Sequence, residues 1–244
     1  MENTFKKQIE IPSQKLDLTG RLRMEECMSY LQDVANDHCE TLSADRWNLI
    51  KSSNAFWVVT KVKVKVEDMP KLDDKLEFET WTIEPTAVKF ERDAQIKKEG
   101  QVLVSLKSEW VALDAENRKI RPAKTLVYPF AMKNRTDRAI EGKFATLNHD
   151  IAEKDYCYSR NIYFGDLDIN NHVNNCYYSR FVFDCFSAKE LTNKKVDTYE
   201  IHFVNECREG EKLDFYLKEI DGGNYVEARV GEKQIVKAFI TWKK

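Results

Sequence analysis

Ten consecutive residues, 166–175, hold the side chains in this sequence that are best suited to chemistry. They read Asp-Leu-Asp-Ile-Asn-Asn-His-Val-Asn-Asn, so a carboxylate, an amide and an imidazole alternate at Asp168, Asn170 and His172. On an extended backbone these three side chains would point to one face. Such a set can hold, polarise and deprotonate a small molecule. A polar turn capped by an asparagine would have a similar composition, so both interpretations stay open.

A helical pattern begins directly after this cluster. Apolar residues recur every four positions from Val173 to Cys185, which is typical of one face of an α-helix. The polar cluster would therefore lie at a helix N-terminus, where free N–H groups and the helix dipole stabilise developing negative charge. We expect an oxyanion site at the backbone of Val173, Asn174 and Asn175.

The bulk composition is that of an ordinary soluble globular protein. Of 244 residues, 42% are hydrophobic and 33% are charged, with a net charge of −2, which gives no general attraction to nucleic acid. No apolar run is long enough to span a membrane, and the first residues lack the apolar core of a secretory signal. The six cysteines form no CxxC motif and no zinc-ligand spacing. We therefore expect reduced thiols, no metal and a cytoplasmic location.

The order of predicted elements repeats once along the chain. Each half has a short strand, a long amphipathic helix and about four strands with alternating polarity, which is typical of half-exposed antiparallel sheets. The first helix is predicted to begin near Arg23 and the second near Val173. We therefore predict two copies of one fold, at 1–130 and 156–244, with a polar linker at 131–155. The predicted strands are 56–66, 75–84, 88–97 and 102–113 in the first half, and 198–207, 212–220, 224–230 and 234–242 in the second.

Matching residues support the repeat. Cys27 and Cys176 are separated by 149 positions, as are Asp17-Leu18 and Asp166-Leu167, and a later match joins 75–78 to 212–215. At a separation of 149, the first half retains the scaffold but lacks the acid, amide and imidazole, which favours chemistry in the second half. In this register the counterparts of Asp168, Asn170 and His172 are Thr19, Arg21 and Arg23.

Partners for His172 are expected in the strand that follows the second helix. Glu206 and Cys207 compete for this role, because neighbours on a regular strand face opposite sides unless a bulge intervenes. Cys207 could equally be a small buried hydrophobe, and Glu206 a solvated edge charge.

Together these features resemble the acyl-acyl-carrier-protein thioesterases, which end fatty-acid elongation by hydrolysis. The motif at 166–175 resembles the active-site signature of that family, and Asn205-Glu206-Cys207-Arg208 resembles its Arg-Glu-Cys element. Segments 56–60, 90–93 and 108–111 also resemble the family. Asn205 departs from the basic residue of plant members, and no plastid transit peptide is apparent, which resembles a bacterial member. The resemblance implies an α+β fold, a tandem (double) hot-dog with two curved antiparallel sheets, each wrapped around a long helix.

The resemblance also implies the reaction and its residues. A thioester would be hydrolysed to a free fatty acid and the phosphopantetheine thiol of the carrier, with no other cofactor. Two mechanisms stay open: Cys207 attacks as a nucleophile activated by His172, or Glu206 or His172 activates a water. We favour water, because a thioester is already an activated acyl group. The implied catalytic set is Asp168, Asn170, His172, Glu206 and Cys207.

The first half would then be a non-catalytic unit that binds the acyl chain. Its basic stretches, such as Lys61 to Lys65, would suit an acidic acyl carrier protein, although solvated strand faces are the simpler interpretation. A homodimer is compatible with this sequence, whereas nucleic acid and membrane partners are not expected. Rival functions are an acyl-CoA thioesterase, a non-catalytic acyl-thioester binding protein and a hot-dog dehydratase. The predicted acyl-pocket residues, each of which could also be plain core, are Met24, Cys27, Met28, Leu31, Phe56 and Trp57.

Overall fold

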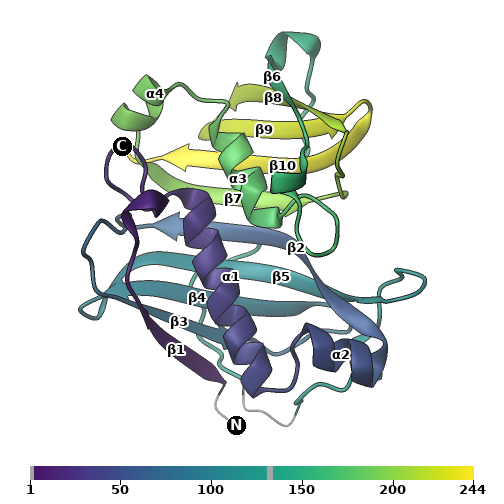
Figure 1. Cartoon of the computed structure of the whole chain (residues 1–244). Helices are drawn as coiled ribbons and strands as arrows, with labels where there is room; N and C mark the ends of the chain where they lie inside the picture. Colours follow the sequence, from purple (N-terminus) through teal and green to yellow (C-terminus); the bar gives the residue numbers. More distant parts are fainter. Residues whose placement is uncertain (1–2, 131–133) are drawn as a thin grey trace.

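One antiparallel sheet of ten strands organises the computed structural model, which describes residues 3–130 and 134–244. The strand order is β1-β3-β4-β5-β2-β7-β10-β9-β8-β6, and the helices lie on one face of the sheet (Figure 1). The strands are β1 (Thr4–Ile9), β2 (Ala55–Val66), β3 (Leu76–Thr82), β4 (Phe90–Lys98), β5 (Gln101–Asp114), β6 (Tyr156–Asn161), β7 (Val196–Phe203), β8 (Lys212–Ile220), β9 (Gly223–Val230) and β10 (Lys233–Trp242). The helices are α1 (Met24–Thr41), α2 (Arg46–Ser53), α3 (Asn175–Phe183) and α4 (Ala188–Asn193).

The two halves of the chain occupy the two halves of this sheet in the same strand order. Strands β1 to β5 fill one side and β6 to β10 the other, and antiparallel pairing of β2 with β7 joins them. In this pairing Val62 lies opposite Ile201, and Lys61 lies opposite His202. The two predicted sheets form one continuous ten-stranded sheet, because edge-to-edge pairing satisfies the backbone groups that two free edge strands would expose.

The two central helices differ in length. Helix α1 spans 18 residues, as its periodicity predicts, whereas α3 spans only nine. The prediction of a long second helix is wrong, because Ser187 and Glu190 form a capping box that starts the separate helix α4. Cys185 consequently lies between two helices and not within one.

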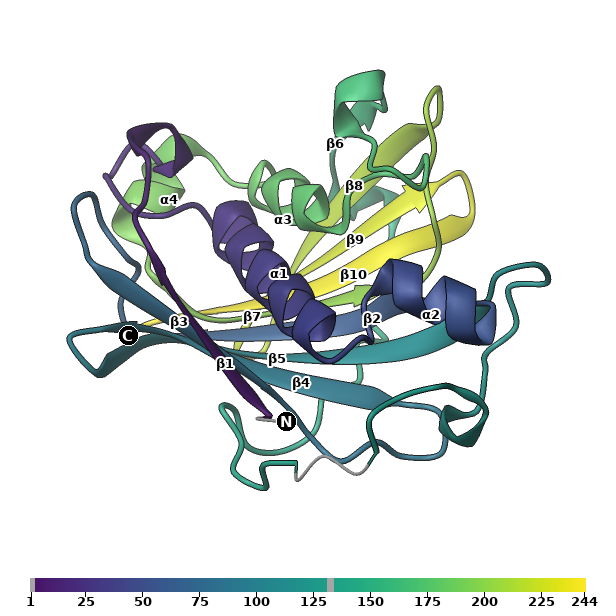
Figure 2. The same ribbon diagram turned by 60° about the horizontal axis from the view of Figure 1, so that its bottom comes forward.

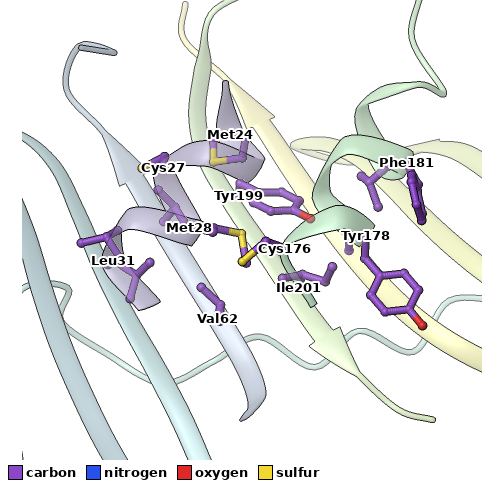
Figure 3. Close-up of a cluster of buried hydrophobic side chains, with 14 of the residues drawn as sticks. Met24, Cys27, Met28, Leu31, Val62, Cys176, Tyr178, Phe181, Tyr199 and Ile201 are labelled. Carbon is purple, nitrogen blue, oxygen red and sulfur yellow. The ribbon is translucent and has the colours of Figure 1, made fainter. Parts of the chain in front are cut away.

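The core lies between these helices and the sheet, along the line where the halves meet (Figure 3). The Ser179 hydroxyl on α3 lies 2.9 Å from the sulfur of Met28 on α1 and accepts a hydrogen bond from the Tyr199 hydroxyl at 3.1 Å. Burying each large apolar side chain here contributes about 1.5–3 kcal/mol. Further buried members are Met24, Cys27, Leu31, Val62, Cys176, Tyr178, Phe181 and Ile201.

The opposite face of the sheet carries buried charges beneath the segment that connects the halves. Figure 2 shows this segment on the side away from α1 and α3. The Asp93 carboxylate is fully buried and accepts from the Arg138 Nε at 3.0 Å, and the Ala145 N–H donates to Glu200 at 2.6 Å. Residues 134–152 contain no helix or strand. They nevertheless cover polar groups that would otherwise need water.

The first residue of β9 is a glycine that packs closely against β10. A Cβ added to Gly223 would overlap the backbone oxygen of Ile240. Gly223→Ala should therefore lower the free energy of unfolding by about 2–3 kcal/mol. Gly165→Ala is the matched control, because its Cβ would meet no atom within 4 Å. Equal chemical-denaturation midpoints for the two variants would contradict this packing.

Candidate active site

The polar motif forms a tight loop before α3, closed by the Asp168 carboxylate. Asp168 accepts from the Asn170 N–H at 2.7 Å and the His172 N–H at 3.4 Å, and its own N–H donates to the His172 carbonyl at 2.8 Å. Asn171 has a φ of 61°, in the left-handed region that asparagine tolerates. The extended backbone expected for this motif is therefore wrong, and the loop itself directs His172.

The first half contains the same loop, two residues out of the predicted register. Asp17 accepts from the Thr19 N–H at 2.7 Å and the Arg21 N–H at 3.2 Å, and Gly20 has a φ of 76° where Asn171 has 61°. The equivalent positions are thus Asp17 and Asp168, which are 151 apart, as are Met24 and Asn175, the first residues of α1 and α3.

This register changes which residues of the two halves are equivalent. The separation of 149 is wrong for the loops and helices, and the first half does keep the aspartate. The later match is confirmed, because Phe78 pairs with Lys7 of β1 while Phe215 pairs with Tyr158 of β6. What the second half adds is the imidazole of His172 in place of Arg21. Asp168 builds the loop, and the chemical difference between the halves rests on His172.

His172 pairs with Glu206, which comes from the loop after β7. The imidazole Nε2 lies 2.9 Å from Glu206 Oε2 and 3.2 Å from Arg208 Nη2. A protonated Nε2 donates to Glu206, whereas an unprotonated one accepts from Arg208, so the two contacts favour opposite protonation states. The His172 side chain is 13% exposed and that of Glu206 is 40% exposed. Arg118 of the first half forms an ion pair with Glu206 Oε1.

The surroundings of His172 favour the neutral imidazole. Burial lowers the pKa of His172, and the charges of Arg208 and Arg118 lower it further. The carboxylates of Glu206 and Asp168 oppose this shift without reversing it. At neutral pH the ring is therefore able to accept a proton.

Cys207 belongs to the buried apolar core. Strand β7 ends at Phe203, so the expected regular strand does not reach Cys207, and its side chain is fully buried. Its carbonyl accepts the Val173 N–H at 2.9 Å. Burial and the nearby Glu211 carboxylate raise the pKa of the thiol to about 12. Within the described residues, no hydrogen bond joins this thiol to His172.

Asn170, a member of the implied catalytic set, binds the loop aspartate. Its side-chain amide donates to Asp168 Oδ2 at 2.9 Å, and the residue is exposed.

Of the three predicted oxyanion donors, two N–H groups already have backbone acceptors. Val173 donates to Cys207 and Asn174 donates to Asp166, each at 2.9 Å. Asn174 also caps α3, because its side chain accepts from the Cys176 N–H. Among these three donors, the Asn175 N–H alone has no hydrogen-bond acceptor in the described part of the chain. An anion at this helix start would therefore meet Asn175.

A pocket with about 450 Å³ of empty space, part of it open to solvent, leads from this helix start into the first half. Its lining includes Asn175 and Cys176 of α3, and Met28 and Leu31 of α1. A second pocket, with about 490 Å³ of empty space that is also partly open to solvent, has Trp57 in its lining. The buried Arg92, which lies 2.9 Å from His38 Nδ1, lines both cavities.

The predicted acyl-pocket residues divide between these cavities and the core. Met28 and Leu31 line the first cavity and Trp57 the second. Met24 and Cys27 are buried in the apolar core, and Phe56 packs against arginine side chains.

Sequence reasoning missed two charged residues of this site, Arg118 and Arg208. Arg208 follows Glu206-Cys207 directly, so its closeness to Glu206 in the sequence could have identified it. Arg118 lies 88 positions before Glu206, and only the pairing of the two halves brings it close. Within residues 3–130 and 134–244, no cluster of histidine, cysteine or acidic side chains is arranged to hold a metal ion. None of the described helices has the length and apolar character needed to cross a bilayer.

The equivalence of the two aspartate loops can be tested by measuring the free energy of unfolding of variants at Asp17 and Asp168. Asp17→Ala and Asp168→Ala should each lower the free energy of unfolding by about 1 kcal/mol, because each removes the acceptor of two backbone N–H groups. The matched Asp→Asn variants keep an acceptor oxygen and should lose much less. Denaturant unfolding measures this difference. An unchanged stability in Asp17→Ala would show that the two loops are not equivalent.

Comparison with known proteins relates both halves of the chain to one protein family. The model of the acyl-ACP thioesterase N-terminal domain matches residues 2–127, and that of the C-terminal domain matches residues 151–244. A chloroplastic palmitoyl-acyl carrier protein thioesterase from Gossypium hirsutum is 22% identical over 239 residues, covering 93% of this chain and 58% of the relative. A chloroplastic acyl-[acyl-carrier-protein] hydrolase from Cuphea viscosissima is 24% identical, covering 92% and 61%. The chain thus spans little more than half the length of these relatives.

Two solved structures share the fold over the whole chain. An acyl-ACP thioesterase from Bacteroides thetaiotaomicron superposes with a TM-score of 0.90 at 20% identity, covering 99% of this chain and 98% of that one. The 12:0-ACP thioesterase from Umbellularia californica gives 0.86 at 18% identity, covering 100% and 97%. With both family models matched in order across nearly its full length, this chain belongs to the acyl-ACP thioesterase family.

Proposed function

We propose that this chain hydrolyses the thioester of a fatty acyl carrier protein and so releases a free fatty acid from fatty-acid synthesis. The observation that carries the proposal is the His172–Glu206 pair at 2.9 Å, beside the start of α3 and the apolar cavity that reaches Asn175. A proton acceptor, an anion site and an apolar chain site are the three parts that acyl-thioester hydrolysis requires. Family membership supports the same reaction.

We also propose that the two halves are two hot-dog units fused in one chain. The equivalent loops, the helix starts 151 residues apart and the matching strand order support this assignment. The unit boundaries predicted at 1–130 and 156–244, a homodimer and a cytoplasmic location stay predictions.

In the proposed mechanism, the His172–Glu206 pair accepts a proton from water while the water oxygen attacks the thioester carbon. The Asn175 N–H binds the resulting oxyanion at the start of α3. Collapse of the tetrahedral intermediate breaks the carbon–sulfur bond, and the leaving thiolate takes the proton from the pair. The neutral imidazole that burial favours is the form this step requires.

A cysteine nucleophile is the less favourable mechanism for this site. With the pKa of Cys207 raised to about 12, roughly one thiol in 100,000 would be ionised at pH 7. The thiol would also have to leave its buried position to reach a substrate. We propose that Cys207 is a structural residue, whose carbonyl anchors the loop at Val173.

The acyl carrier protein is the proposed partner, because exposed cations lie at the site. Arg208 is exposed beside His172, and the Lys233 ammonium donates to the Glu206 carbonyl at 2.8 Å. The basic strand residues of β2 are less suitable for docking, since Lys63 pairs with the buried Glu200 at 3.0 Å. An acyl-CoA substrate carries the same thioester. Hydrolysis rates on carrier and CoA substrates of equal chain length distinguish the two.

Variants of His172 and Cys207 test the mechanism directly. His172→Ala should lower kcat at least about 100-fold, because it removes the proton acceptor. Cys207→Ala should stay within about tenfold of the wild type, the cost of a small change in packing. Fatty-acid release from acyl carrier protein measures both. An inactive but folded Cys207→Ala, with an acyl-enzyme trapped in the wild type, would establish the nucleophile mechanism instead.

Salt dependence tests the carrier protein as partner. Raising the ionic strength to about 0.5 M should increase KM for acyl carrier protein, because it shortens the range of charge attraction to a few ångströms. A short uncharged acyl thioester, which has no carrier to attract, should show a nearly constant KM. A salt-independent KM for the carrier substrate would contradict electrostatic docking.

A further inference from the structure

Arg118 connects the non-catalytic half of the chain to the candidate active site. It lies in the turn after β5, in the first half, and its guanidinium pairs with Oε1 of Glu206. The other oxygen of the same carboxylate, Oε2, lies 2.9 Å from His172 Nε2. One carboxylate therefore bridges an arginine from one half and a histidine from the other.

The turn that carries Arg118 is held firmly in place. The Asp114 side chain accepts from the N–H groups of Glu116 and Asn117 at 3.0 and 3.1 Å, and from Arg121 Nη1 at 3.1 Å. Arg118 itself has a φ of 57°, in a region that non-glycine residues rarely adopt. An uncommon backbone conformation that its surroundings maintain is a frequent feature of functional positions.

The guanidinium is also confined by an aromatic ring. Its central carbon lies 5.4 Å from the centroid of the Phe56 ring on β2. Arg46 of α2 lies 5.9 Å from the same ring but pairs with no carboxylate among the described residues. Stacking on an aromatic face limits the rotation of an arginine side chain. Phe56, predicted to line the acyl pocket, therefore supports Arg118.

We propose that Arg118 is a positioning residue for the Glu206–His172 pair, so that the active site is assembled from both halves of the chain. The inference rests on the proposed function. Arg118 contacts no reacting atom; it fixes the carboxylate whose other oxygen faces the imidazole. Because the Arg118 and Glu206 side chains are 46% and 40% exposed, their pair contributes little to stability. The proposed effect of the pair is to fix the position of the Glu206 carboxylate.

The pair also gives Arg118 an electrostatic effect that can be measured. The charged groups facing His172 are Glu206, Arg208, Arg118 and Asp168. Of these, Arg118 lowers the pKa of His172, so its removal should raise that pKa. Activity that requires a neutral imidazole would then begin to fall at a higher pH than in the wild type.

The experiment measures kcat, KM and the pH profile of kcat/KM for Arg118→Ala and Arg118→Lys in the full chain. A short acyl thioester without carrier protein is the substrate, so that docking does not contribute. Arg118→Ala should lower kcat about fivefold with little change in KM, and the acid limb should move to higher pH. Arg118→Lys keeps the charge and should restore part of kcat. The control is Lys119→Ala, which removes the adjacent exposed cation and should leave kcat and the pH profile unchanged.

A double-mutant cycle with Glu206→Gln shows whether Arg118 acts through Glu206. In the Glu206→Gln background, Arg118→Ala should cause less than about a twofold further loss, because the interaction is already absent. Additive losses, or a wild-type kcat and pH profile in a folded Arg118→Ala, would overturn the inference. A higher KM only for the carrier substrate would also overturn it and assign Arg118 to docking. If the wild-type chain hydrolysed neither substrate, the proposed function itself would fail, whereas an active His172→Ala would contradict only the role of His172.

Discussion

The pairing of β2 with β7 is the constraint on which the rest of this molecule depends. It joins two five-stranded halves into one sheet and so places α1 against α3. That contact aligns a cavity of the first half with the start of α3 in the second. The same pairing brings the turn after β5 next to Glu206. Neither half alone would contain the cavity, the anion site and the complete charge cluster.

The proposed chemistry then depends on competition for a single ring nitrogen. Glu206 favours a protonated His172 Nε2, whereas Arg208 and burial favour an unprotonated one. A group held between two protonation states can accept a proton and return it within one reaction cycle. The buried Cys207 lies outside this competition, and its carbonyl holds the loop that presents the histidine.

The sequence was sufficient to predict the repeat, the first helix and most strands. Those features depend on local periodicity, which short segments express directly. It was insufficient for the register of the loops, because the matches at a separation of 149 involved only one or two residues. The hydrogen bonds that Asp17 and Asp168 accept, which define the register, are visible only in the structure. It was also insufficient for Arg118, because a contact across 88 positions depends on how the halves pair. The end of α3 could have been predicted from the sequence, because Ser187 and Glu190 form a capping box that starts a new helix.

The pH dependence of kcat/KM in the wild type and in Glu206→Gln measures whether the His172–Glu206 pair accepts the proton. If the His172–Glu206 pair accepts the proton, the wild-type rate falls on the acid side with a midpoint below the ordinary histidine value. Removing the carboxylate, which raises the pKa of His172, should lower the rate and move that midpoint to still lower pH. A midpoint unaffected by the substitution, or activity that rises only as a thiol ionises at high pH, would show that this pair is not the proton acceptor.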